Sequence, residues 1–182
     1  MSAAAVDRLF FAVWPSEAER AAMAAVAARL ELGPGIRRVA AEDYHVTVAF
    51  VGEVPVARIE ALIGIGAASA RGPCALAFDA YEYWPKPEVV VAAARQIPAN
   101  LDRLWRALHE RLGAIGCGLD PKRLRPHVTL ARGVADDPAL PSPPACAWNV
   151  TDLCLMRSAR GRTTPAYTVV ARWPLLDEPA SG

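Results

Sequence analysis

Apolar and polar residues follow two periods along this chain, one typical of buried strands and one typical of amphipathic helices. Short apolar runs rich in β-branched and aromatic residues predict strands over residues 9–14, 44–51, 75–83, 88–94, 125–132, 148–156 and 166–173. Longer segments with apolar residues three or four positions apart predict helices over residues 16–32, 55–70 and 98–112. The proline-rich stretch 138–144 predicts a loop. This mixture of elements is typical of an α+β fold.

Local signals mark where several elements begin and end. Ser16 stands three residues before Glu19, the spacing of a capping box at the start of a helix. Glycine and proline at positions 33–35 predict the end of that helix. The sequence Trp-Pro-Lys-Pro at 84–87 separates two predicted strands and indicates that they form a hairpin.

The order of the elements occurs twice. Leu9 begins a strand–helix–strand series that reaches a histidine at position 45, and Val89 begins a similar series that reaches a histidine at position 127. This regularity predicts an internal duplication with repeat units of about residues 8–52 and 88–133, inside a single bilobal domain that spans residues 1–182. Two such copies would form two pseudo-symmetric lobes of antiparallel-rich sheet, with helices outside and a central cleft between them.

Composition narrows the class of protein. The 182 residues are 53% hydrophobic, enough to bury a core, and a net charge of +1 excludes a protein that coats nucleic acid with its whole surface. Apolar runs are shorter than the roughly 18 residues that a membrane span needs, and the N-terminal segment lacks a signal-peptide core. We expect a soluble, cytoplasmic monomer that does not act at a membrane. The four cysteines form no C-x-x-C pair, so we expect reduced, structural thiols.

Two of the three histidines stand in matching tetrapeptides. His45-Val-Thr-Val and His127-Val-Thr-Leu are both H-x-T-x sequences on predicted strands. Side chains alternate between the faces of a strand, so His45 shares a face with Thr47, and His127 shares one with Thr129. The intervening residues are apolar and can pack into the lobes. Both histidine–threonine pairs are therefore expected to face the central cleft.

This constellation suits chemistry on a phosphodiester. Histidine titrates near neutrality, so two imidazoles across a cleft can divide the work of a general acid and a general base. Threonine hydroxyls can hold the phosphate oxygens, and positioning with hydrogen bonds can stabilise the transition state without a metal ion. A basic cluster surrounds the second motif, namely Lys122, Arg123, Arg125 and Arg132. It favours an anionic substrate over a neutral one.

The paired motifs resemble those of the two-histidine (2H) phosphoesterases, and within them the RNA 2′,3′-cyclic phosphodiesterases, also called 2′-5′ RNA ligases or LigT-like proteins. The resemblance extends from Arg8 nearly to Leu175. Further stretches that resemble this family are Arg8-Leu-Phe-Phe-Ala12, Phe50-Val-Gly-Glu53, Arg125-Pro-His127, Ala131-Arg132 and Ala171-Arg-Trp-Pro-Leu175. The resemblance implies an enzyme that hydrolyses RNA 2′,3′-cyclic phosphate termini to 2′-phosphates, with tRNA fragments or cyclic nucleotides among the candidate substrates.

The resemblance also implies roles for individual residues. His45 would donate a proton to the leaving 3′ oxygen, and His127 would accept a proton from water. Thr47, Thr129 and Arg132 would contact the phosphate, and neither a metal nor a cofactor would be needed. In a regular strand Arg132 would face away from His127, so its contact requires a β-bulge, a strand end or a curled side chain.

Other interpretations remain open at this stage. The same site could ligate 2′-5′ ends, with a 5′-hydroxyl in place of water, or the cleft could bind RNA ends or cyclic nucleotides without turnover. His109 lies within a predicted helix among charged residues and is expected to be a solvated surface side chain. Three aromatic residues, Phe11, Trp84 and Tyr167, are candidates for stacking on a base, although strand aromatics pack more often in a core.

Overall fold

The computed structural model describes residues 5–119, 122–136, 138–142, 146–159 and 165–177. The strands are β1 (Val6–Val13), β2 (Arg37–Arg38), β3 (Val46–Pro55), β4 (Cys74–Phe78), β5 (Ala80–Trp84), β6 (Val89–Ala93), β7 (His127–Arg132), β8 (Cys146–Val150), β9 (Asp152–Ser158) and β10 (Tyr167–Pro174). The helices are α1 (Glu17–Ala28), α2 (Ile59–Ser69) and α3 (Ala99–Ala114), with short 3-10 turns η1 (Ala41–Asp43) and η2 (Val56–Arg58). The predicted α+β class is confirmed.

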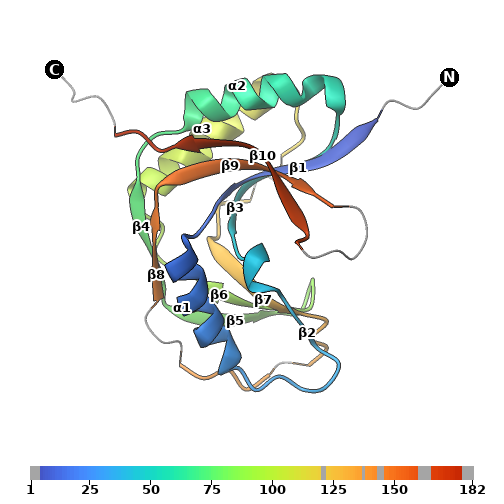
Figure 1. Ribbon diagram of the computed structural model, residues 1–182, viewed down its shortest axis with the longest axis vertical. Helices are drawn as coiled ribbons and strands as arrows, with labels where there is room; N and C mark the ends of the chain where they lie inside the picture. Colours follow the sequence, from blue (N-terminus) through green and yellow to red (C-terminus); the bar gives the residue numbers. More distant parts are fainter. Residues whose placement is uncertain (1–4, 120–121, 137, 143–145, 160–164, 178–182) are drawn as a thin grey trace.

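Two four-stranded sheets form the halves of the molecule. The first has the strand order β10-β9-β1-β3, and the second has the order β2-β7-β6-β5; all of their pairings are antiparallel. In Figure 1 the first sheet lies above the second, and the two-stranded sheet β4-β8 runs along one side. The first H-x-T-x motif lies on β3 except for His45, which directly precedes this strand, and the whole second motif lies on β7, in the other large sheet.

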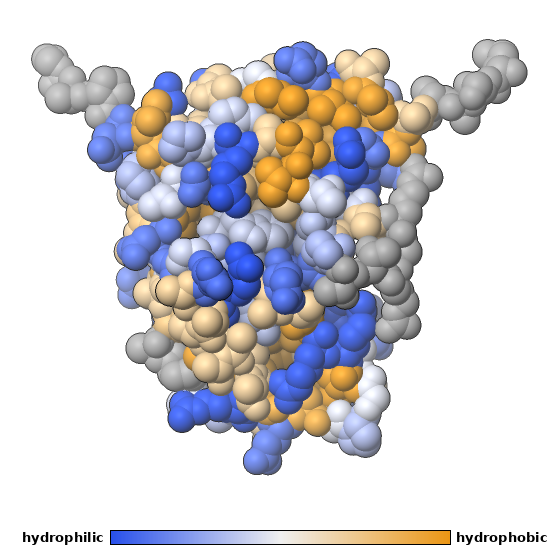
Figure 2. All heavy atoms as spheres, viewed as in Figure 1, coloured by the Kyte–Doolittle hydropathy of each residue, from blue (hydrophilic) through white to orange (hydrophobic). Residues whose placement is uncertain are grey.

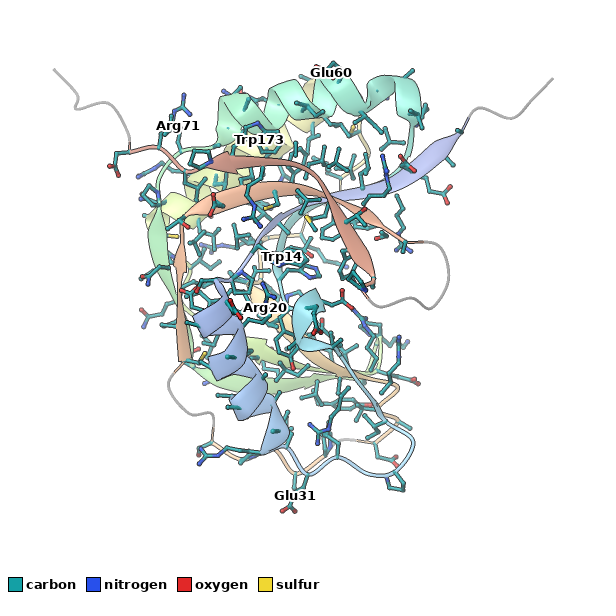
Figure 3. All side chains as sticks on the ribbon, viewed as in Figure 1. Trp14, Arg20, Glu31, Glu60, Arg71 and Trp173 are labelled. Carbon is teal, nitrogen blue, oxygen red and sulfur yellow. The ribbon has the colours of Figure 1, made fainter. Side chains whose placement is uncertain are left out.

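The helices cover the outer side of the first sheet and one edge of the molecule. α2 packs against β9, β10 and α3, while α1 contacts η1 and β8 (Figure 1). Gly66 allows the close approach of α2 to β10, because a Cβ atom there would overlap the Trp173 ring. Trp173 points from β10 toward α2 in Figure 3. Figure 2 shows apolar side chains gathered at the end of the molecule where α2 lies.

The predicted start of the first helix is confirmed, but its predicted end is wrong. The Ser16 side chain accepts a hydrogen bond from the Glu19 amide and the Glu19 carboxylate accepts one from the Ser16 amide, so the capping box is complete. The helix ends at Ala28 rather than near residue 32. The Arg38 guanidinium donates at 2.6 Å to the carbonyl oxygen of Ala27 in the last turn and, also at 2.6 Å, to that of Leu30 just beyond the helix.

Two predicted strands are each two strands in the structure. The segment 75–83 divides at Asp79 into β4, which pairs with β8, and β5, which pairs with β6. The Asp79 carboxylate accepts a hydrogen bond from the Arg95 amide, which fixes this break. The segment 148–156 divides in the same way at Thr151 into β8 and β9. The hairpin predicted around residues 84–87 is confirmed as β5–β6, and part of the loop predicted at 138–144 lies outside the described residues.

The cysteines are reduced in this structure, as the sequence predicts. All four cysteines are free thiols, with Cys154 buried and the other three half-buried. Within the described ranges, no helix combines the length and apolar character needed to cross a membrane.

Candidate active site

A cavity of about 520 Å³ lies between the two large sheets and brings together all five residues singled out from the sequence. His45, Thr47, His127, Thr129 and Arg132 all line it. The rest of its described lining is Arg8, Phe10, Arg37, Phe50, Trp84, Pro87, Val89, Ser158, Ala159, Ala166 and Tyr167. The two motifs, 82 positions apart in sequence, therefore face one common space.

A β-bulge in β7 turns Arg132 toward this cavity. Thr129 lies opposite Val91 of β6, and Arg132 lies opposite Val89, so three steps along β7 correspond to two steps along β6. Val89 and Val91 are two residues apart and share a face, and so do the residues opposite them. His127, which is two positions before Thr129, joins them. The bulge that a contact from Arg132 requires is present.

The first sheet contains the same irregularity at the equivalent place. Thr47 lies opposite Ala12 of β1 and Phe50 lies opposite Phe10, so three steps along β3 again correspond to two steps along the partner strand. Phe50, five positions after His45, therefore stands where Arg132 stands in the second sheet. Its side chain is 47% exposed, unusually high for phenylalanine, because it borders the cavity instead of packing in the core.

His45 lines the cavity and lies in an aromatic surrounding. Its Nδ1 is 2.7 Å from the carbonyl oxygen of Asp43; a carbonyl only accepts, so Nδ1 carries the proton and Nε2 is left to act. The ring of Trp14 stacks on the imidazole at 5.2 Å, and Phe10 and Tyr167 lie at 5.1 and 4.8 Å. Trp14 lies between the two sheets in Figure 3.

Burial among these rings determines the protonation of His45. The pKa of His45 is lowered from 6.5 to about 4, chiefly by loss of solvent and to a smaller extent by the positive charges of His127 and Arg132, against the opposing effect of the Asp43 carbonyl. In the free protein at neutral pH, His45 is therefore a neutral imidazole.

His127 has the same backbone anchor but a more polar surrounding. Its Nδ1 donates to the carbonyl oxygen of Arg125 at 2.7 Å, which again leaves Nε2 to act. The Trp84 ring lies 4.4 Å away, and its Nε1–H donates to Glu82, which also accepts from the Arg125 guanidinium. Burial, followed by the charges of Arg125 and Arg132, lowers the pKa of His127, while Glu82 and the carbonyl of Arg125 oppose this effect.

The charged side chains that line the cavity are all arginines among the described residues. Arg37 lies opposite Arg132 in the β2–β7 pair, and Arg8 lies over the Phe50 ring, 5.0 Å from its centroid. Two like charges directly opposite each other destabilise a sheet unless an anion lies between them. The described lining of the cavity is therefore electropositive, which suits an anionic ligand.

Sequence reasoning missed Arg37 and Asp43. No motif or periodic pattern in the sequence marks Arg37, because only its pairing with β7 places it in the cavity. The Asp43 carboxylate is buried and accepts from the Ala166 amide at 2.8 Å, which holds the start of β10 beside His45; burial raises its pKa. Phe11 is fully buried and cannot stack on a base. His109 is not a simple surface residue, because its Nδ1 donates to the Trp105 carbonyl and it lines a second cavity.

Metal ligands are not clustered in the described part of the chain. No group of three or more histidine, cysteine, aspartate or glutamate side chains is placed there to hold an ion.

Comparisons with known proteins identify the family. The model of the family described as "LigT like Phosphoesterase" matches residues 13–91, which include the first histidine motif. The RNA 2′,3′-cyclic phosphodiesterase of Escherichia coli (strain K12) is 34% identical over 174 residues, covering 93% of this chain and 97% of the relative. This chain belongs to the LigT-like phosphoesterase family.

Solved LigT-like structures share the whole fold. The crystal structure of a phosphoesterase matches with a TM-score of 0.86 at 31% identity, covering 94% of this chain and 99% of that one. The Escherichia coli LigT complexed with 3′-AMP matches with a TM-score of 0.85 at 31% identity and the same coverage. The predicted LigT-like fold is thereby confirmed over nearly the entire chain.

Proposed function

We propose that this LigT-like chain hydrolyses 2′,3′-cyclic phosphate at RNA ends to a 2′-phosphomonoester without a metal ion. The observation that carries the proposal is one cavity lined by two imidazoles whose Nδ1 atoms are held by backbone carbonyls, which leaves their Nε2 atoms to act, beside three arginines and no carboxylate side chain among the described residues that line it. The relatives named RNA 2′,3′-cyclic phosphodiesterase and the relative crystallised with 3′-AMP support the choice of substrate.

The two histidines divide the proton transfers. Nε2 of His127 takes a proton from water as the water oxygen bonds to phosphorus, and the bond from phosphorus to the 3′ oxygen breaks. Nε2 of His45 gives its proton to that leaving oxygen. The product is a 2′-phosphate, and exchange with solvent returns both imidazoles to their starting states.

The residues beside the histidines hold the phosphate. The hydroxyls of Thr47 and Thr129 and the guanidinium of Arg132 donate hydrogen bonds to the non-bridging oxygens, which gain charge in the transition state. His45 must be protonated to act as the acid, although its pKa is about 4 in the free protein. The bound phosphate anion raises this pKa, because it offsets the repulsion from His127 and Arg132.

The test is an assay in EDTA with adenosine 2′,3′-cyclic phosphate and with an RNA that ends in a cyclic phosphate. Chromatography separates 2′- from 3′-phosphate products. A 2′-phosphate formed in EDTA supports the proposal. A 3′-phosphate would overturn the assignment of the leaving oxygen, dependence on added metal would overturn the metal-free mechanism, and absence of product would leave a binding or ligase role for the cleft.

The pH dependence of kcat/KM should lie on the acid side of the ordinary histidine range. Catalysis requires one proton on the histidine pair, and in the free protein both pKa values are below 6.5. We expect kcat/KM to peak below pH 6.5 and to fall about ten-fold per pH unit well above it. The alkaline limb of kcat should lie at higher pH, since bound phosphate favours the imidazolium. A kcat/KM maximum near pH 8 would contradict this arrangement.

The substitution Arg37→Gln should raise the stability of the ligand-free protein and lower its activity. Removing one of two opposed charges relieves repulsion worth about 0.2–1 kcal/mol, so the melting temperature without ligand should rise by up to about 3 °C. The same variant should bind phosphate more weakly and show a lower kcat/KM. Thermal melts with and without inorganic phosphate, beside the kinetics, measure both effects; an unchanged response to phosphate would remove Arg37 from the site.

We propose further that the active form is a monomer, because the residues assigned to catalysis all come from one chain. Light scattering at assay concentrations tests this. Turnover of tRNA fragments, compared with that of unrelated RNA ends, tests whether tRNA is the preferred source of substrate.

A further inference from the structure

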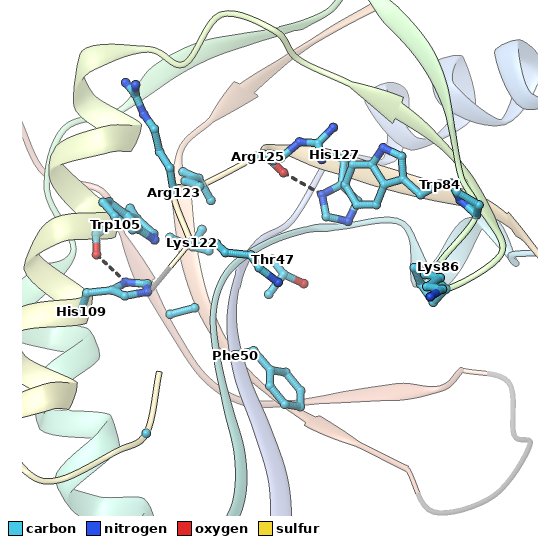
Figure 4. Close-up of a pocket in the computed structure, with 16 residues that line it drawn as sticks. Thr47, Phe50, Trp84, Lys86, Trp105, His109, Lys122, Arg123, Arg125 and His127 are labelled. Carbon is cyan, nitrogen blue, oxygen red and sulfur yellow. Dashed lines mark hydrogen bonds between the residues drawn. The ribbon is translucent and has the colours of Figure 1, made fainter. Parts of the chain in front are cut away.

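A second, larger cavity adjoins the proposed catalytic site. It has a volume of about 930 Å³ and shares five lining residues with the 520 Å³ cavity, namely Thr47, Phe50, Trp84, Pro87 and His127. Figure 4 shows it between Trp105 and His109 of α3 on one side and Trp84 and Lys86 of the β5–β6 turn on the other. We call this second cavity the side groove. A molecule bound at His127 can therefore extend into it without leaving the protein surface.

The described lining of the side groove is basic and contains no acidic residue. Lys86, Lys122 and Arg123 are exposed along it. Arg125 also lines it, but its guanidinium is held by Glu82 and lies 4.5 Å over the Trp84 ring. The whole chain has a net charge of only +1, so this is a local concentration of positive charge. Such a groove attracts a polyanion rather than a neutral molecule.

Aromatic rings form the remaining walls. Phe50 and Trp84 stand where the two cavities meet, and Trp105 lies farther along the groove with its ring 4.5 Å from that of His109. Proteins that bind single-stranded nucleic acid combine a positive groove along the phosphates with aromatic surfaces for the bases. The side groove has both features, and its volume is near the upper end for ligand sites.

We propose that the side groove binds the nucleotides on the 5′ side of the cyclic phosphate, so that the enzyme prefers an RNA strand over a cyclic mononucleotide. The inference rests on the proposed function, because the cyclic phosphate must occupy the cavity between the sheets. The strand continues from the 5′ oxygen of the ribose that carries this cyclic phosphate, so a bound RNA end must leave that cavity along the protein surface. Lys122 and Arg123 pair with its backbone phosphates, while Trp105 offers a surface to a base.

The experiment compares adenosine 2′,3′-cyclic phosphate with a tetra-adenylate that ends in a 2′,3′-cyclic phosphate. If two backbone phosphates are contacted, kcat/KM for the tetranucleotide should fall about 7-fold more than for the mononucleotide between 50 and 200 mM salt. In the double variant Lys122→Gln/Arg123→Gln, this extra salt dependence and the preference for the longer substrate should disappear. Its kcat/KM for the mononucleotide should stay unchanged. Arg29→Gln/Arg71→Gln, which removes two exposed charges outside both cavities, is the matched control and should behave like the native protein.

Equal kcat/KM values for the two substrates in the native protein would overturn the proposal. So would a groove variant that slows both substrates alike, or a control variant that also loses the length preference. If the native protein hydrolyses neither substrate, the proposed function fails, and binding decides the groove separately. A labelled tetra-adenylate with a 3′-monophosphate should then bind the native and control proteins more tightly than the groove variant. Equal affinities would remove the groove as an RNA site.

Discussion

Replacing His45 or His127 by alanine is expected to lower kcat for 2′,3′-cyclic phosphate hydrolysis by about 10²- to 10⁴-fold, the usual contribution of a general acid or base. Each substitution removes the only Nε2 atom that can serve one end of the in-line displacement. The Nδ1 atoms are already engaged with the carbonyls of Asp43 and Arg125, so the remaining histidine cannot turn to replace its partner.

The effects of the two histidine substitutions on kcat should not add. The two histidines act on one transition state, so the double variant should be little slower than the slower single variant. Product formation measured at a saturating concentration of adenosine 2′,3′-cyclic phosphate checks this, with melting temperatures to show that the variants are folded. A single variant that retains more than a tenth of native kcat would contradict the assigned role of that histidine.

Strand periodicity placed four of the five predicted site residues on common faces, while Arg132 came from the family resemblance. His45 and Thr47 share a face by alternation alone, as do His127 and Thr129. Arg132 does not follow from alternation, because the β7 bulge depends on how β6 pairs with it, and that pairing is a tertiary property. Arg37 lies on a strand of two residues, too short to leave a periodic pattern, and only its partner Arg132 places it in the cavity.

The strand boundaries show the same limit. Buried apolar residues continue at alternate positions across Asp79, at Leu76, Phe78 and Ala80, although β4 and β5 belong to different sheets. What separates them is the hydrogen bond from the Arg95 amide to Asp79, which joins positions 16 residues apart. The end of α1 likewise depends on Arg38, ten residues beyond the helix. Local sequence predicts the type of element well, while distant partners determine where it stops.

We propose that the repeat units of about residues 8–52 and 88–133, within a single bilobal domain, derive from one ancestral unit. Their equivalent bulges, each after the threonine of an H-x-T-x motif, support the proposal. The two units differ at the position five residues after each histidine. Five positions after the first histidine stands Phe50, which borders the groove, and five positions after the second stands Arg132, which lines the cavity between the sheets. Divergence at this one position makes the two ends of the cleft unlike.

Arg132→Met should lower kcat/KM by about 10- to 100-fold with little change in stability. The guanidinium forms charge-assisted hydrogen bonds with the phosphate, each worth about 1.5–3 kcal/mol, and removing it from the free protein relieves repulsion from Arg37. Arg132→Lys should be intermediate, because it keeps the charge but loses the planar fork that matches two phosphate oxygens.

Arg38→Met is the matched control, since Arg38 adjoins Arg37 on β2 and donates to carbonyls at the end of α1. Its loss should cost about 1 kcal/mol, or about 2–4 °C in melting temperature, and leave kcat/KM near the native value. Kinetics and thermal melts on the same preparations should therefore show opposite patterns for the two variants. Arg132→Met should slow hydrolysis with little change in melting temperature, and Arg38→Met should lower the melting temperature with little change in kcat/KM. If Arg132→Met lowered the melting temperature as Arg38→Met does, and slowed hydrolysis no more, Arg132 would be a structural residue and the bulge would serve packing instead of catalysis.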